Sequence, residues 1–519
     1  MLHLKSFVPS SRRQTVMASL LLATALTPMP AALAQDASVF VYADAGEPTT
    51  LDPARTNTNY EFTVTRSVYD RLINYDLDNP SDLQPGLALE WAQDGNAWVV
   101  KLRQGVKFHD GSTFDAYDVK ATLDRLLALK LGQSYLVSEI TKVAVVDPAT
   151  VRIETSQPNV FLPANLSKIE MLSADDIAAH SGDGDTFFSQ GGNGTGPYKF
   201  VSWKRGVQIE LERNTDWWGK FSEKPFDRIV DRFVEDGANR ARGVEGGEFD
   251  MANFIPLEDA IRIGTQTGFK LIEGNNLWAW PAIYLNTRKT PTDNADFREA
   301  LVKAFDYQAM LDFSHGKATT PRGPVPEWFP SSPEAQEPEI KTNLDEASAA
   351  LAKSGIQNAT MNCSIPAGFP EFRFAATILQ ASAAQLGVTV EVDERPTVEA
   401  LKAIKNNETN CFAIGNANLS PADATKFFAA HYSKSGHYNA AQLDLPELEK
   451  IIADMPTVTD QSERSAQLKR AFELVVGSNA IIWTARPKTL VVQPDRVTGY
   501  RVDPAEYINI RFWEMGQAQ

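Results

Sequence analysis

Helical and strand patterns alternate through the second half of this chain, from about residue 296 to residue 415. Apolar residues recur there at the spacing of one helix face or in the short runs typical of buried strands. A strand–helix–strand–helix–strand series of this length predicts a parallel sheet with right-handed crossovers, so we expect an α/β fold. The helices are expected over 297–313, 344–353, 371–386 and 398–406, and the strands over 360–365, 388–392 and 411–415.

The first half of the chain has a more mixed texture. No internal repeat or low-complexity linker separates it from the second half. At about 100–200 residues per domain, a chain of 519 residues is expected to hold two or three domains and a sizeable core. Strands are expected over 39–43, 97–103 and 208–212, and helices over 60–73 and 119–127.

The charge balance excludes two classes of partner. The 50 Lys and Arg residues are outnumbered by 66 Asp and Glu residues, which gives a formal net charge of −16. An acidic protein of this kind is repelled by nucleic acid and by anionic membranes, so neither is expected as a partner.

The two cysteines, Cys363 and Cys411, are too few for a disulfide framework or a cysteine-rich metal site. Each lies in a predicted strand. A disulfide would form in an oxidising compartment if the two strands are neighbours, and two buried thiols are the alternative.

The N-terminus has the features of an export signal. The basic residues Lys5, Arg12 and Arg13 precede an apolar run over 16–26 and the small-residue site Ala32-Leu33-Ala34. The run is too short to span a bilayer, so we expect cleavage after Ala34 and a periplasmic product. The general export route is favoured, with the twin-arginine route left open. The mature chain would have 519 − 34 = 485 residues.

Motifs of exported hydrolases are mostly absent. Neither Gly-x-Ser-x-Gly nor His-Glu-x-x-His occurs, and Ser314-His315-Gly316-Lys317 matches the nucleophile pattern Ser-x-x-Lys without the partner motifs that pattern requires. Gly192, Gly194 and Gly196 lead into Pro197 and a strand, which favours a tight crossing loop over a phosphate site.

The six histidines are too scattered to indicate a metal centre. His109-Asp110-Gly111 lies between two strand-forming stretches and is first a turn signal. The sequence therefore predicts no catalytic residue, no metal site and no cofactor.

Several blocks carry a resemblance to a known family. Residues 87–91, 98–111 and 114–119, reading Leu-Ala-Leu-Glu-Trp, Trp-Val-Val-Lys-Leu-Arg-Gln-Gly-Val-Lys-Phe-His-Asp-Gly and Phe-Asp-Ala-Tyr-Asp-Val, resemble the signature of family 5 extracellular solute-binding proteins. These proteins are the dipeptide/oligopeptide-type receptors of ABC importers. Further blocks that fit in the same order are 49–53, 194–198, 213–218, 247–250, 284–288, 298–301 and 304–306.

The resemblance implies a two-lobed periplasmic binding protein (type II, cluster C-like) with an extra domain in the first lobe. It also implies a monomer that closes on a peptide, a small molecule, or a peptide-sized opine, glycoside or oligosaccharide. The receptor would deliver this ligand to an inner-membrane ABC permease with its ATPase. The implied domains are the signal peptide 1–34, lobe I over 35–55, 195–274 and 487–519, the additional domain 56–194, and lobe II over 275–486.

The resemblance further implies that four strand-end regions contact the ligand, since α/β sheets bind ligands at strand ends facing a cleft. The block around His109 is assigned a structural role instead. For the pair Trp278 and Trp280, burial in the core is the alternative to lining the cleft. The expected ligand-binding residues are Thr49, Thr50, Trp278, Trp280, Phe369, Asn416, Asn418 and Ser420.

The region 416–420 departs from the peptide-binding members, which carry a Trp followed three residues later by an Asp. No acid occurs here before Asp423, so a ligand with a free N-terminus would lack its buried charge partner. The alternative is a shifted loop in which Asp423 takes this role. Neutral amides, a hydroxyl and Trp faces suit a sugar, glycoside or opine at least as well as a peptide. An oligopeptide or dipeptide receptor proper is the first alternative, and an exported hydrolase is the second.

Overall fold

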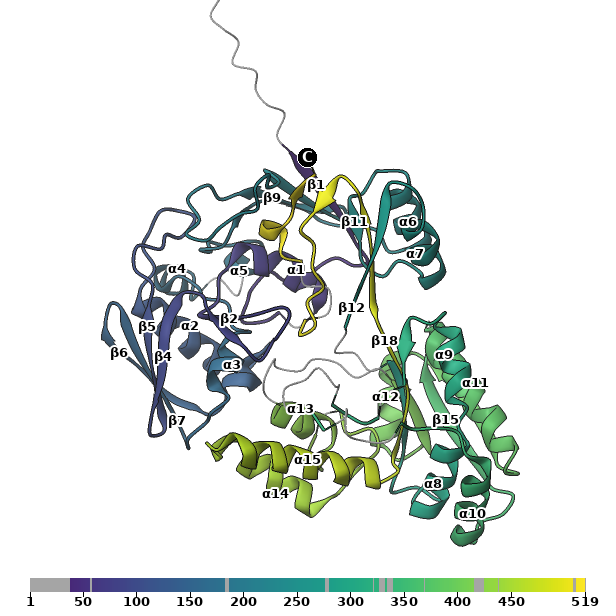
Figure 1. Cartoon of the computed structure of the whole chain (residues 1–519). Helices are drawn as coiled ribbons and strands as arrows, with labels where there is room; N and C mark the ends of the chain where they lie inside the picture. Colours follow the sequence, from purple (N-terminus) through teal and green to yellow (C-terminus); the bar gives the residue numbers. More distant parts are fainter. Residues whose placement is uncertain are drawn as a thin grey trace, which may run out of the picture. The chain divides into compact units, whose positions relative to one another are not determined.

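The computed structural model is shown in Figure 1. It describes residues 38–56, 58–182, 186–275, 280–320, 322–325, 332–333, 339–367, 369–414, 424–436, 438–506 and 510–518. The predicted signal peptide lies outside the described residues.

A five-stranded sheet, ordered β11-β1-β10-β9-β8, forms around the N-terminal strand. Strand β1 is parallel to β10 and to β11, whereas β9 is antiparallel to β10 and β8. The residues of β1 alternate between two apolar clusters. Phe40 and Tyr42 pack with helix α1, and Ala43 packs with helices α6 and α7. The bounds are β1 Val39–Asp44, β8 Tyr198–Lys204, β9 Gln208–Arg213, β10 Arg228–Phe233, β11 Met251–Ala252, α1 Asn59–Val68, α6 Gly237–Glu245 and α7 Leu257–Gly264.

A four-stranded antiparallel sheet, ordered β4-β5-β7-β6, belongs to the segment after α1. Helix α2 covers it, and its apolar residues Val119, Leu123 and Leu126 join the same core cluster as Val100 and Val151. The bounds are β2 Ile73–Tyr75, β3 Leu83–Pro85, β4 Ala88–Asp94, β5 Ala97–Leu102, α2 Ala116–Leu129, η1 Ser134–Val137, β6 Ile140–Asp147, β7 Thr150–Thr155, α3 Leu162–Leu166, α4 Ala174–Ala179 and α5 Thr186–Ser189.

A six-stranded sheet, ordered β14-β18-β13-β17-β15-β16, forms in the second half of the chain. Strand β15 is parallel to both β16 and β17, as the alternating pattern predicts. Helices α8 and α11 pack on one face, and α12, α13 and α15 pack on the other. The bounds are β13 Trp280–Leu285, α8 Ala295–Ala304, α9 Tyr307–Phe313, β14 Ala318–Thr319, α10 Leu344–Ser354, β15 Thr360–Pro366, α11 Pro370–Ala384, β16 Thr389–Arg395, α12 Thr397–Lys405, β17 Cys411–Ile414, α13 Ala424–His431, α14 Pro446–Asp454, α15 Gln461–Gly477 and β18 Ile481–Pro487.

Two antiparallel strands flank the six-stranded sheet in the chain order. Strand β12 precedes β13, strand β19 follows β18, and the two pair with each other along their whole length (Figure 1). The remaining bounds are β12 Phe269–Gly274, η3 Met455–Thr457, β19 Thr489–Pro494, β20 Val497–Thr498, η4 Phe512–Glu514 and β21 Gly516–Gln517.

The expected helix over 297–313 is wrong as a single element, because two helices occupy this stretch. Helix α8 ends at Ala304, because the next residue, Phe305, leaves the helical conformation (ψ 133°). Asp306 then caps α9 by accepting a hydrogen bond from the amide of Ala309. An Asp at such a position offers the backbone an alternative to the continuing helix, and here it starts a new one.

The structure settles the question that the sequence left open about the cysteines. Cys363 of β15 lies directly opposite Cys411 of β17 in the parallel register, and the two form a disulfide with Cα atoms 4.4 Å apart. Both side chains are buried in the core cluster between the sheet and helix α11.

A buried ion-pair network ties the C-terminal segment to the first half of the chain. The carboxylate of Glu506 lies 3.1 Å from Arg66, 3.3 Å from Arg71 and 2.9 Å from Lys168. Burial opposes ionisation of Glu506, but these cations hold its pKa well below the usual range. Arg66 is paired a second time, with Glu170 at 3.3 Å.

Candidate functional site

The carboxyl ends of β1, β10 and β11 lie at one edge of the five-stranded sheet, because the three strands are parallel. The loops that follow them, 45–50, 234–236 and 253–256, therefore gather there. Open α/β sheets bind ligands outside the carboxyl ends of their strands, so this edge is the first part of the candidate site.

Arg240 fixes two of these loops. Its buried guanidinium donates to four backbone carbonyls, two after β10 and two after β11. The acceptors are Val234 at 2.6 Å, Glu235 at 2.8 Å, Asn253 at 2.8 Å and Phe254 at 2.8 Å. A planar fork with five donors is suited to this task, whereas an ammonium group is not.

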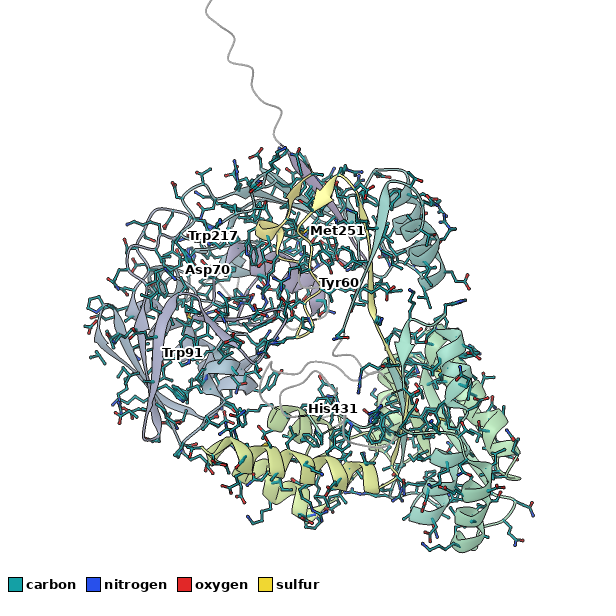
Figure 2. The ribbon with its side chains drawn as sticks, in the orientation of Figure 1. Tyr60, Asp70, Trp91, Trp217, Met251 and His431 are labelled. Carbon is teal, nitrogen blue, oxygen red and sulfur yellow. A yellow bond between two sulfur atoms is a disulfide. The ribbon has the colours of Figure 1, made fainter. Side chains whose placement is uncertain are left out.

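Phe254 and Tyr60 are the aromatic residues at this edge. The carbonyl of Phe254 accepts a hydrogen bond from Arg240, and the residue as a whole is 39% exposed. Its backbone is left-handed (φ 46°), which is unfavourable for a bulky residue. Tyr60 of α1 is half-buried beside Gly46, where a Cβ would lie only 2.7 Å from the Tyr60 ring (Figure 2). Sequence reasoning missed both residues.

The predicted residues Thr49 and Thr50 lie at this edge, but their hydroxyl groups already have partners. Thr49 donates to Glu61 at 2.6 Å, and Thr50 accepts from the amide of Asp52 at 3.1 Å. Both bonds stabilise the turn that leads into α1. Because both hydroxyl groups are already hydrogen-bonded, this loop would offer a ligand its fixed backbone and the neighbouring side chains.

The six-stranded sheet supplies a second edge. Ala282 of β13 pairs with Ile414 at the carboxyl end of β17, and β15 runs parallel to β17, so Trp280, the segment after β15 and the segment after β17 share one edge. Phe369 follows β15, precedes α11 and is 44% exposed. The structure therefore brings the predicted Trp280 backbone and Phe369 to the same edge of the sheet. The predicted residues Trp278, Asn416, Asn418 and Ser420 lie outside the described residues.

Two of the further blocks that resemble the family, 194–198 and 213–218, meet around Asp70. The carboxylate of the half-buried Asp70 accepts from Trp218 at 2.7 Å, Trp217 at 3.3 Å and Thr195 at 3.0 Å. Burial raises the pKa of Asp70 to about 6, although these hydrogen bonds oppose the rise. Trp217, Trp218 and the loop that carries Thr195 are therefore held together by Asp70 and serve the packing of this region.

The loop over 192–196 is a tight crossing, as predicted. A Cβ on Gly194 would lie 1.9 Å from the carbonyl oxygen of Val68 at the end of α1. His109 holds the same loop, because its amide donates to Gly194 and its Nε2 lies 3.0 Å from the carbonyl of Gly196. A carbonyl only accepts, so Nε2 carries the proton, and burial lowers the pKa of His109 to about 4.

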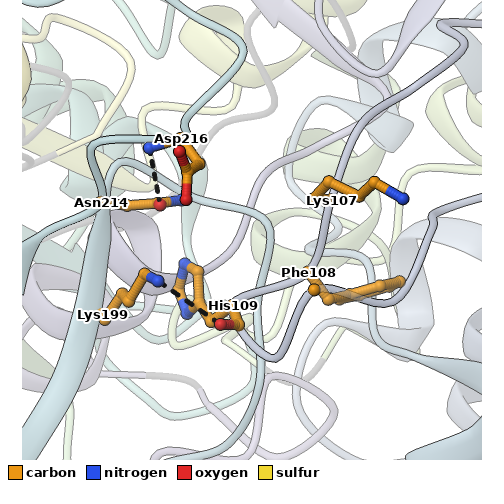
Figure 3. A pocket seen from close by; sticks show the side chains of 7 residues that line it. Lys107, Phe108, His109, Lys199, Asn214 and Asp216 are labelled. Atoms are coloured by element: carbon orange, nitrogen blue, oxygen red, sulfur yellow. Dashed lines mark hydrogen bonds between the residues drawn. The ribbon is translucent and has the colours of Figure 1, made fainter.

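A cavity of about 320 Å³ lies beside His109 (Figure 3). Its polar groups serve the local structure: Lys199 donates to the carbonyl of His109 at 3.4 Å, and Asn214 donates to Gly196 at 3.0 Å. Lys107 donates to Thr113 at 2.5 Å. The cavity is lined by Lys107, Phe108, His109, Gly111, Lys199, Asn214 and Asp216.

The Ser-x-x-Lys match does not form a nucleophile–base pair. Ser314 is buried and donates to the carbonyl of Met310 at 2.9 Å, at the end of α9. Lys317 forms an ion pair with Glu273. Within the described ranges, no helix has both the length and the apolar character needed to cross a bilayer.

The comparison with protein families decides the classification. The model of the bacterial extracellular solute-binding proteins, family 5 (middle region), matches residues 82–439. The chain belongs to this family. As a member it is a solute-binding protein of the type that serves ABC importers, which confirms the sequence-based assignment.

Relatives of this family 5 protein match it over nearly its whole length. It is 27% identical over 511 residues to the probable D,D-dipeptide-binding periplasmic protein DdpA of Escherichia coli K12, covering 95% of this chain and 96% of that protein. It is 28% identical over 485 residues to the glutathione-binding protein GsiB of Pectobacterium atrosepticum, covering 88% and 90%.

A solved structure confirms the fold of this family 5 protein. HbpA2 from Haemophilus parasuis superposes with a TM-score of 0.80 at 24% identity, covering 93% of this chain and 100% of that one. The expected α/β periplasmic-binding-protein fold is therefore confirmed.

Proposed function

We propose that this solute-binding protein is the periplasmic receptor of an ABC importer and captures a peptide-sized ligand, namely a peptide, an opine, or an oligosaccharide or glycoside. The observation that carries the proposal is the family match over residues 82–439. Relatives that match nearly the full length are named for a D,D-dipeptide and for glutathione, which are ligands of this size.

The proposed ligand-binding residues come from the two sheet edges. The first edge contributes the loop with Thr49 and Thr50 together with the aromatic residues Tyr60 and Phe254. Exposed aromatic faces beside fixed backbone groups suit a cleft that binds an uncharged or amphipathic solute. The second edge contributes Trp278, Trp280, Phe369, Asn416, Asn418 and Ser420.

A true oligopeptide receptor remains the alternative. A peptide with a free N-terminus would need a buried carboxylate near its ammonium, and the sequence 416–420 has none before Asp423. This difference is why an opine, glycoside or oligosaccharide is proposed alongside a peptide.

We also propose that the protein does not convert its ligand chemically. Ser314, the residue that matches a nucleophile motif, is hydrogen-bonded to a backbone carbonyl, and Lys317 is paired with Glu273. We further propose cleavage of a signal peptide after Ala34, export to the periplasm, and action as a monomer with an inner-membrane permease and its ATPase. We propose the same domain boundaries as the sequence implies, with lobe II over 275–486.

A titration by tryptophan fluorescence tests the function. The mature protein is titrated with a D,D-dipeptide, glutathione and an oligosaccharide, and each mixture is then analysed for chemical change. We expect saturable binding of a compound that is recovered intact. Chemical conversion of the bound compound would support the exported hydrolase instead.

Variants in the same titration test the site. Phe254→Ala and Phe369→Ala are each expected to weaken binding about ten-fold, since each removes an aromatic contact. Tyr117→Ala is the matched control, because Tyr117 on α2 is also exposed (58%) but belongs to neither edge. Equal affinity of all three variants and the parent would remove these edges from the site.

A further inference from the structure

Two carboxyl groups lie inside the core of the five-stranded sheet. Asp231 of β10 pairs in register with Tyr42 of β1, and Asp44 is two residues further along β1, so the two acids share the face that packs on α1. Their exposed fractions are 0% for Asp44 and 1% for Asp231.

Among the described residues, both carboxyl groups have oxygen atoms without a hydrogen-bond partner. Neither carboxyl oxygen of Asp231, nor Oδ2 of Asp44, has a hydrogen-bond partner within the described part of the chain. A buried ionised carboxylate without donors is severely penalised, so Asp231 must be neutral. A neutral carboxyl has one O–H to donate, and Asp44, on the same face of the sheet, has an oxygen that lacks a donor.

We propose that Asp44 and Asp231 bind one proton between them at neutral pH, with the protonated Asp231 donating to the carboxylate of Asp44. The shared proton is a structural ligand of the sheet edge. Asp44 also accepts from the side-chain amide of Asn253, whose oxygen accepts from the amide of Ala45 at 2.9 Å. The proton thus supports the base of the loops that carry the candidate site.

The surroundings offer little compensation for a second negative charge. Arg240 of α6 is a cation that acts on Asp44, and its guanidinium is already engaged with four carbonyls. Two further titratable groups lie nearby: Tyr60 of α1 interacts with Asp44, and Tyr42 of β1 is the register partner of Asp231. Strand β9 presents the apolar Ile209 opposite Asp231.

The titration behaviour agrees with this arrangement. Burial raises the pKa of Asp44 to about 7, although hydrogen bonds from Asn253 and the following amides oppose the rise. Burial, together with the charge of Asp44, raises the pKa of Asp231 well above its usual range. The folded protein therefore holds protons that the unfolded chain releases near pH 4, so stability should fall as pH rises through neutrality.

Urea unfolding of the full mature chain between about pH 5 and pH 9 tests the proposal. The parent is expected to lose stability as pH rises. Asp231→Asn replaces the shared proton with a permanent amide donor, so its unfolding midpoint should fall less than the parent's as pH rises over this range and should exceed that of the parent at high pH. Asp495→Asn, at an exposed site, is the control and should keep the parent's pH dependence.

Two results would overturn the proposal. The first is an equal pH dependence in the parent and in Asp231→Asn. The second is a parent stability that differs between Na⁺ and K⁺ at the same pH and ionic strength, because a metal cation would then occupy the site in place of the proton.

If Asp231→Asn does not fold, infrared spectroscopy of the parent tests for the shared proton without a substitution. At about pH 7.5 the spectrum should contain the carbonyl band of a protonated, buried carboxylic acid that resists exchange in D₂O. Absence of that band would contradict a shared proton without any substitution.

Discussion

Arg240 organises the candidate site without offering a group to a ligand. Its four hydrogen bonds go to backbone carbonyls at the ends of two neighbouring strands, and one of them holds Phe254 in its left-handed conformation. Local strain of this kind persists only where surrounding contacts over-determine it. The hydrogen bond from Arg240 to the carbonyl of Phe254 therefore helps to fix the position of the Phe254 side chain.

Arg240→Ala is expected to lower the free energy of unfolding by about 3 kcal/mol, because several buried carbonyls lose their donor at once. Urea unfolding measures the loss. Arg242→Ala is the control on the same helix, since Arg242 is exposed and should change stability by less than about 0.5 kcal/mol. A similar small effect of both substitutions would contradict the role of Arg240.

The residues of the site were only partly predictable from the sequence. Phe369 follows a recognisable strand, so its place at the sheet edge could be expected. Arg240 and Phe254 gave no such signal, because their roles depend on two loops meeting across the parallel register of β1, β10 and β11. Asp231 was also missed, since a single acid in an alternating strand ordinarily faces solvent.

The glycine loop over 192–196 shows how one element fixes another. Gly194 and Gly196 allow the loop to cross directly over the carbonyl groups at the end of α1, and His109 fastens it from the other side. The signature around His109 is thus explained by the packing of a turn against a crossing loop. The sequence could indicate the turn and the loop, but their contact depends on tertiary structure.

Gly194→Ala is expected to destabilise the protein by more than about 2 kcal/mol, because its Cβ would overlap the backbone of Val68. Thermal unfolding provides the measurement. Gly477→Ala, where a Cβ meets no atom within 4 Å, should have a neutral or slightly stabilising effect. An unchanged melting temperature for Gly194→Ala would show that the loop is not held against α1.

The disulfide joins two elements that are separated by 48 residues in the chain. Its loss in Cys363→Ala with Cys411→Ala is expected to cost about 4 kcal/mol, from the entropy of a loop of this length in the unfolded state. Thiol titration of the denatured, unreduced periplasmic protein should first detect no thiol. Two reactive thiols would contradict the bridge.

The C-terminal segment around Glu506 contacts parts of the molecule that are far apart in the sequence. Glu506 pairs with Arg66, Arg71 and Lys168, and the adjacent Ala505 packs in the same cluster as Tyr75 and residues of the six-stranded sheet. Such a junction could not be anticipated from sequence, since its members are hundreds of positions apart and none belongs to a local motif.

Glu506→Gln is expected to cost about 3 kcal/mol of unfolding free energy at neutral pH, because three buried cations lose a shared partner. The depressed pKa of Glu506 means that its contribution is present above the unfolded pKa and is lost as pH falls. The difference from the parent, followed by urea unfolding, should therefore shrink below about pH 4. Glu258→Gln at an exposed site (87%) is the control. A difference that grows as pH falls would contradict this account.

The central claim is that this family 5 protein is a receptor that holds a peptide-sized solute. Native mass spectrometry of the mature protein, purified from its own periplasm, tests it most directly. We predict a 485-residue chain carrying one intact small-molecule adduct that gentle activation releases, with the mass of an opine, glycoside, oligosaccharide or short peptide. A peptide with a free amine would support the oligopeptide alternative. Ligand-free protein that binds none of these classes on addition, or that converts them, would contradict the receptor function.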